Sequence, residues 1–151
     1  GNHDYWWKSI SKVRSILPPD MYAVQNDYVA VDKIAVCGTR GWTIPGSGCS
    51  EQDEKIYQRE LLRAELSLEK AAADGFERKV FMLHYPPFAE RQIDGKFQNL
   101  FNRFGVELCV YGHLHGSDHR YAVEGEIEGI RYLFVACDYT EFTPVRVIEN
   151  V

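Results

Sequence analysis

The sequence Leu108-Cys109-Val110-Tyr111-Gly112-His113-Leu114-His115-Gly116 places two histidines, separated by one residue, directly after an apolar run. The apolar residues predict a buried β-strand, and the glycines predict a tight loop at its end. Such a loop would bring both imidazoles into one small volume. Imidazole nitrogen suits ions such as Mn, Fe, Zn and Ni, so this stretch predicts a metal site at the end of a strand.

The composition of the chain is that of a globular protein. Its 151 residues suffice for a single domain, residues 1–151, with a hydrophobic core, and they are 45% hydrophobic and 26% charged. No apolar run of about 18 residues predicts a membrane span. The net charge of −5 makes nucleic-acid binding through phosphate neutralisation unlikely as the sole mode of action. The cysteines form no Cys-x-x-Cys pair, and Cys37, Cys109 and Cys137 lie in or beside apolar runs. This favours buried, reduced thiols in a cytoplasmic protein over disulfides; the fourth cysteine is Cys49.

Hydrophobic periodicity predicts alternating helices and strands. Apolar spacings of three and four predict helices at residues 6–17, 50–74 and 97–104. Apolar and β-branched runs predict strands at residues 21–25, 28–32, 33–38, 79–84, 107–111, 119–124, 130–137 and 145–148. Asn26-Asp27 is interpreted as a hairpin turn, and the last three strands as antiparallel. This order predicts an α/β layered fold with a mixed sheet and no internal domain boundary.

Several polar residues lie directly after predicted strands or before the first predicted helix. His84 and His113 follow predicted strands, and Asn2-His3-Asp4 forms a turn before the first helix. Ligands of open α/β sheets bind beyond the carboxyl ends of strands, so these groups converge on one rim if the strands are neighbours. The His-x-His loop could instead be structural, and His84 a hydrogen-bonded core histidine. Asp4 could cap the helix and still serve in a site.

Together these blocks resemble the calcineurin-like metallophosphoesterase family. The turn 1–4, His84 and the Gly-His-Leu-His loop occur in the family's order. The resemblance implies an αββα sandwich that binds two divalent transition-metal ions (Mn, Fe, Zn or Ni). It also implies hydrolysis of a phosphoester, on a small molecule or a phosphoprotein, by a metal-bound hydroxide.

The resemblance also implies roles for single residues. Asn2, His84 and His113 would bind the second metal, and His115 the first. His3 would protonate the leaving group, with Asp4 orienting it.

The family's Asp-x-His and Gly-Asp blocks, which supply the bridging carboxylate and further ligands of the first metal, have no counterpart before Asn2. We therefore expect the fold to be incomplete at its N-terminus, with a preceding segment, or a chain that supplies it, completing the site. Residues 1–151 alone are expected to be inactive. The alternative is a non-catalytic metal-binding or scaffold relative of the same fold.

The glycine-rich loop 38–49 carries two further candidates. Arg40 could bind a substrate phosphate bidentately or be solvated. Trp42 could stack on a base or pin the loop, and we favour pinning. Elsewhere, His119 is interpreted as a surface residue or one that supports the ligands, with contact to substrate as the alternative. The spacing of aromatic residues predicts core positions at Trp6, Trp7, Phe97, Phe101 and Phe104.

Overall fold

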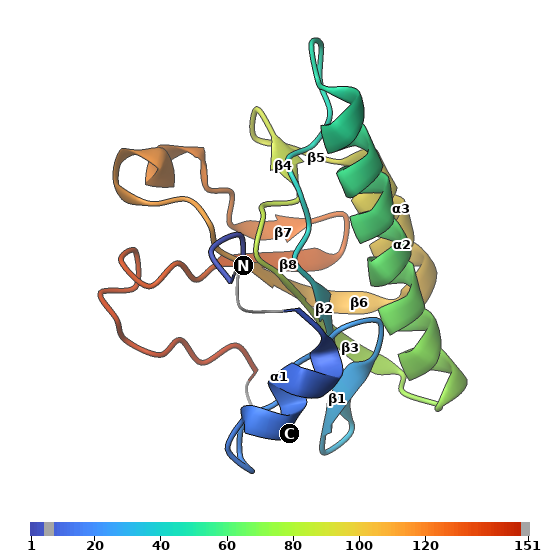
Figure 1. Ribbon diagram of the computed structural model, residues 1–151. Helices are drawn as coiled ribbons and strands as arrows, with labels where there is room; N and C mark the ends of the chain where they lie inside the picture. The colour runs from blue at the N-terminus through green and yellow to red at the C-terminus, as the bar shows by residue number, and fades with distance from the viewer. Residues whose placement is uncertain (5–7, 149–151) are drawn as a thin grey trace.

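The computed structural model describes residues 1–4 and 8–148, and a six-stranded mixed sheet forms its centre (Figure 1). The elements, in chain order, are α1 (Ile10–Ile16), β1 (Tyr28–Val31), β2 (Ile34–Thr39), α2 (Glu51–Ala73), β3 (Arg78–Leu83), β4 (Phe88–Ala89), β5 (Gln92–Ile93), α3 (Gly95–Phe104), β6 (Val106–Tyr111), the 3-10 helix η1 (Gly116–Tyr121), β7 (Gly125–Ile127) and β8 (Ile130–Phe134). Helices α2 and α3 cover one face of the sheet.

The strand order is β1-β2-β3-β6-β8-β7, with β4 and β5 forming a separate small hairpin. Strands β2, β3, β6 and β8 are parallel neighbours, and β1 and β7 are antiparallel edges. The predicted α/β class with a mixed sheet is therefore confirmed. The carboxyl ends of the four parallel strands lie at the same edge of the sheet, which is where ligands bind in open α/β folds.

Helix α2 follows from local signals in the sequence. The Ser50 side chain accepts a hydrogen bond from the backbone N–H of Asp53 at 3.0 Å and so caps the first turn. Gly75, with a φ of +86°, follows the last turn in a conformation that side chains disfavour. The apolar face of α2 is buried with α3 against one side of the sheet, in a core that includes Phe81, Phe97 and Phe101. The predicted core positions Phe97 and Phe101 are confirmed, and Phe104 is partly buried against this core.

The opposite face of the sheet has a smaller core. Ile34, Val80 and Leu108 form it, and residues of the C-terminal segment, Val147 and Ile148, pack against them. The predicted strand at residues 145–148 is wrong, because this segment contributes apolar side chains without a backbone ladder. Met82 on β3 remains 39% exposed.

The region before β1 also differs from the prediction. Residues 21–25 form no strand, because side chains satisfy their backbone groups: Arg14 donates to the carbonyl of Ala23, and Asp27 accepts from the N–H of Gln25. Asn26-Asp27 is therefore no hairpin turn. The hairpin turn lies at residues 32–33 instead, between paired strands β1 and β2.

Helix α1 begins later than predicted. Ser9 caps it by accepting from the N–H of Lys12, so Asp4 is not its N-cap. The helix ends at Ile16, before Pro18-Pro19. The predicted core residues Trp6 and Trp7 lie outside the described residues.

A further difference lies after the histidine loop. Residues 119–124 form no strand: η1 occupies the first half of them, and the hydroxyl of Tyr111 bonds both the N–H and the carbonyl of Val123 at 2.7 and 2.6 Å. Strand β8 is parallel to β6 and antiparallel only to β7. Across the described residues, no helix has the length and apolarity to span a membrane. All four cysteines are free; Cys137, expected to be buried, is exposed together with Cys49.

Glu60 on α2 contacts Thr39 at the carboxyl end of β2. Its side chain is fully buried, accepts from Thr39 at 2.6 Å and from Arg63 at 2.9 Å, and lies 3.6 Å from Arg40. Removing one partner from a buried charged network costs far more than breaking an exposed pair.

We expect Glu60→Gln to lower the free energy of unfolding by about 2–3 kcal/mol, as measured by urea denaturation. The matched control is Glu65→Gln on the same helix. Glu65 pairs with the exposed Arg103, so its substitution is expected to cost less than about 1 kcal/mol. Equal, small losses in the two variants would contradict a structural role for Glu60.

Candidate metal centre

Three donor side chains from distant parts of the chain meet at the carboxyl edge of the sheet. The Nε2 atom of His84 lies 2.7 Å from Oδ1 of Asn2 and 3.0 Å from Nδ1 of His113. Asn2 belongs to the N-terminal turn, His84 follows β3, and His113 follows β6. The structure thus brings together three residues that the sequence placed on one rim.

The strand pairing explains why His84 and His113 meet. β3 and β6 are parallel neighbours, with Met82 opposite Val110, so both strands end at the same level. The N–H of Gly112 donates to the carbonyl of His84 at 3.3 Å and connects the two strand ends. His113 itself has a φ of +75°, a left-handed conformation that costs a non-glycine residue about 1–2 kcal/mol.

The three donors suit a divalent transition-metal ion. Two imidazole nitrogens and an amide oxygen match the ligand preferences of Mn, Fe, Zn and Ni. Ligands with bonds of about 2.0–2.2 Å to one ion lie about 3 Å from each other, close to the observed separations. Asn2, His84 and His113 therefore fit one metal ion.

The electrostatics favour the neutral imidazole that a metal requires. Burial, the nearby N-terminal amino group and His113 together lower the pKa of His84 to about 4. Burial also lowers the pKa of His113, with contributions from His115 and His3. Both imidazoles are thus neutral at pH 7.

This pKa predicts an acid sensitivity of the metal-free protein. The unfolded chain protonates His84 near pH 6.5 but the folded chain only near pH 4, so the free energy of unfolding falls as the pH drops between these values. We expect wild type to lose about 1–2 kcal/mol more than His84→Gln between pH 7 and pH 4, in urea denaturation with a chelator present. Parallel pH profiles of the two proteins would refute this prediction.

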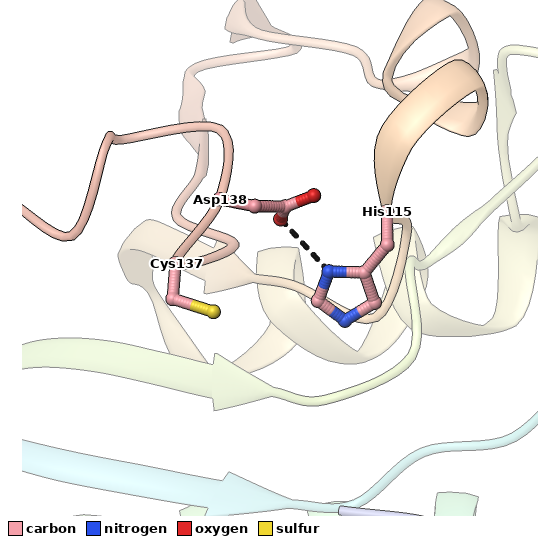
Figure 2. A group of neighbouring side chains, drawn as sticks. All are labelled: His115, Cys137 and Asp138. Carbon is pink, nitrogen blue, oxygen red and sulfur yellow. Dashed lines mark hydrogen bonds and ion pairs between the residues drawn. The ribbon is translucent and has the colours of Figure 1, made fainter.

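His115 lies beside a carboxylate that follows β8. Its Nδ1 is 2.8 Å from Oδ1 of Asp138, and the N–H of Gly116 donates to Oδ2 of the same carboxylate at 3.0 Å (Figure 2). The backbone N–H and His115 hold the pKa of Asp138 well below its usual range. Within the described ranges, a single group of three or more His, Cys, Asp or Glu donors lies within 4.8 Å of one another: His115, Cys137 and Asp138.

His119 lies next to this pair. Its Nε2 is 3.0 Å from Oδ2 of Asp138, although the geometry is not that of a hydrogen bond, and its ring packs between Phe134 and Tyr139. The sequence interpretation of His119 as a surface or supporting residue fits this partly buried position.

His3 and Asp4 lie close to the histidine cluster. His3 is near enough to His113 to lower the pKa of the His113 imidazole. Asp4 has the opposite effect on His84, whose pKa it raises. Asp4 also accepts a hydrogen bond from the amino group of Gly1. The roles of His3 as acid and of Asp4 as its orienting group stay predictions.

Arg40 touches the site through its backbone. Its carbonyl accepts from the N–H groups of His84 and Tyr85 at 3.1 and 2.9 Å. Its guanidinium stacks 4.6 Å over Trp42 and faces Glu60. Trp42 pins the loop as favoured above, because its indole N–H donates to Asp53 of α2 at 3.0 Å. A contact of Arg40 with substrate stays a prediction.

Asp138 is the residue of this region that sequence reasoning missed. It directly follows the predicted strand 130–137, and the strand-end rule applied to His84 and His113 applies to it equally. The sequence pattern does not show that this strand runs parallel to β6, so its end could not be assigned to the same edge of the sheet.

A family model described as calcineurin-like phosphoesterase matches residues 1–117. The match covers the N-terminal turn, His84 and the histidine loop. No curated protein and no solved structure gave a significant match to the chain.

Proposed function

Because this chain belongs to the calcineurin-like phosphoesterase family, we propose that it forms the metal centre of a phosphoester hydrolase with two divalent transition-metal ions. The observation that carries the proposal is the convergence of Asn2, His84 and His113 on one point, with both imidazoles held neutral. These residues would hold the second metal ion and His115 the first.

Bound divalent ions supply positive charge for phosphoryl oxygens and lower the pKa of water so that it attacks at neutral pH. The residues of the chain then have separate tasks. His3, exposed beside the cluster, donates a proton to the leaving oxygen, and Asp4 orients it. Arg40 binds a phosphate oxygen once its guanidinium turns from Glu60 toward the site. The substrate is a phosphoester on a small molecule or a phosphoprotein.

The first metal ion needs more ligands than the described residues bring to it. We propose that the bridging carboxylate and the remaining ligands come from a segment that precedes Gly1, or from a chain that supplies it. Residues 1–151 without that segment would bind one metal ion at Asn2, His84 and His113. They would not catalyse hydrolysis that needs two metal ions. The free cysteines fit a reducing compartment, and we propose a cytoplasmic location.

A second candidate function is a non-catalytic metal-binding or scaffold role. It is favoured by one observation: in the described part of the chain, the Asn2–His84–His113 group includes no carboxylate, and the group of His, Cys and Asp donors at His115, Cys137 and Asp138 includes one. In this case the chain binds a metal ion for structure, without hydrolysis.

Hydrolysis of p-nitrophenyl phosphate and bis(p-nitrophenyl) phosphate distinguishes these functions. Residues 1–151 and the same chain extended by its upstream coding sequence would be assayed with Mn²⁺, with Zn²⁺ and with a chelator. Metal-dependent turnover by the extended protein, lost in His3→Ala, supports the hydrolase. Stoichiometric metal binding without turnover by either protein supports the scaffold.

A further inference from the structure

We propose that Asp138 is a positioning residue that holds the Nδ1–H of His115 and so directs the Nε2 lone pair of that imidazole toward the metal centre. The proposal rests on the proposed role of His115 as a ligand. Three observations lead to it: the register of two strands, the contacts of one carboxylate, and the hydrogen bonds of one loop.

The strand register brings the two residues together. β6 and β8 are parallel neighbours, with Tyr111 opposite Phe134, and the N–H of Val135 continues the pairing to Tyr111 at 2.8 Å. The loops that leave both strands therefore start side by side. A Cβ at Gly112 would lie only 3.9 Å from the Cα of Ala136, which confirms how closely the loops run.

The contacts of the carboxylate decide where the proton of His115 lies. The N–H of Gly116 can only donate, so Oδ2 of Asp138 is an acceptor. Oδ1 faces Nδ1 of His115 at 2.8 Å, and an ionised carboxylate only accepts. In the neutral imidazole the proton is therefore on Nδ1, and Nε2 carries the lone pair. Figure 2 shows Nε2 on the side of the ring away from Asp138.

The loop that carries Asp138 is fixed by its own hydrogen bonds. Both Tyr139 and Thr140 donate backbone N–H groups to the carbonyl of Ala136 at 3.0 Å. The Tyr139 hydroxyl donates to Glu124 at 2.8 Å, and Glu124 also accepts from the N–H of Phe134. The carboxylate is thus held by a braced turn, as expected for a group that orients another side chain.

Pairs of a carboxylate and a metal-bound histidine are common, and removing the carboxylate typically weakens metal binding by about 10–100-fold. The competing reading is that His115, Asp138 and Cys137 bind an ion of their own, since their donor atoms lie within 4.8 Å of one another. The hydrogen bonds to both carboxylate oxygens favour the positioning role.

Long-range ¹H–¹⁵N correlation spectra of the His115 ring in the metal-free protein test the proposal. Wild type is expected to show the Nδ1–H tautomer. In Asp138→Asn, the amide oxygen accepts from Gly116 and its NH₂ group faces Nδ1, so the ring is expected to switch to Nε2–H. Asp138→Ala is expected to give a mixture. The matched control is Asp118→Asn, which removes the same charge from an exposed site in η1 and should leave the tautomer unchanged.

Titration with Zn²⁺ and with Co²⁺ completes the test. In the protein that carries the complete site, Zn²⁺ is expected to shift Nε2 of His115, and about 10–100-fold more Zn²⁺ should be needed for this shift in Asp138→Asn. An Nε2–H tautomer in wild type, or the same tautomer in Asp138→Asn, would overturn the proposal. So would a thiolate-to-Co²⁺ band that Cys137→Ser removes, because His115 and Asp138 would then share an ion.

If His115 is not the metal ligand that the proposed function requires, the same experiments give a different result. The Nδ1–H tautomer would be present and depend on Asp138, but Zn²⁺ would leave Nε2 of His115 unshifted in a protein that carries the complete site. That outcome rejects the ligand role of His115 and retains the hydrogen-bonded pair.

Discussion

Replacement of His84 by alanine is expected to weaken Mn²⁺ or Zn²⁺ binding by about 100-fold or more, since loss of a direct ligand exceeds the effect of losing a supporting residue. His84 is central to the cluster, because its Nε2 is the atom that both Asn2 and His113 approach. In the protein that carries the complete site, hydrolysis should fall by about 1,000-fold, because a catalytic metal ion contributes several kcal/mol to transition-state stabilisation.

Isothermal titration calorimetry and turnover of p-nitrophenyl phosphate measure the two effects. Asn99→Ala, an exposed change on α3, is the control and should leave both unchanged. Circular dichroism would verify that His84→Ala is folded. Metal affinity within threefold of wild type in a folded His84→Ala protein would show that the cluster is not a metal centre.

Replacement of Phe101 by alanine is expected to lower the free energy of unfolding by about 3–5 kcal/mol. Phe101 is fully buried, with its ring 5.0 Å from that of Phe81 in β3 and 5.7 Å from that of Phe97. Its removal leaves a cavity between α3 and β3, the strand that precedes His84, and the surrounding helix and sheet can close it only in part.

Urea denaturation measures this loss, again with Asn99→Ala on the same helix as the control, which should change stability by less than about 0.5 kcal/mol. Phe101→Leu keeps most of the volume and should fall between the two. A loss below about 1 kcal/mol for Phe101→Ala would mean that α3 does not hold the sheet as described.

Local signals were sufficient to predict the elements that support the site. The regular apolar spacing predicted α2, whose first turn Ser50 caps, and two continuous apolar runs predicted β3 and β6. Each of these patterns acts within one segment, so no knowledge of tertiary contacts was required.

Tertiary contacts decided the segments that were predicted wrongly. Residues 119–124 are rich enough in apolar side chains for a strand, but the hydroxyl of Tyr111 takes the backbone groups of Val123 that a ladder would need. The apolar residues at 145–148 pack on the second face of the sheet without pairing. No pattern within either segment reveals these distant partners.

The difference between local signals and tertiary contacts also explains which residues of the candidate site were predicted. The strand-end rule located His84 and His113, since each follows a strand that the sequence makes clear. Asp138 also follows a strand, but its proximity to His115 depends on β8 running parallel to β6, which only the fold establishes.

The left-handed backbone of His113 lowers the stability of the histidine loop, while its imidazole lies in the candidate metal centre. A glycine would adopt this φ without strain, yet it would offer no imidazole to the cluster. The protein therefore retains a less stable loop, and with it an imidazole whose Nδ1 lies 3.0 Å from Nε2 of His84. Selection for stability alone would favour replacing this histidine, so its presence reflects a demand on the loop other than folding.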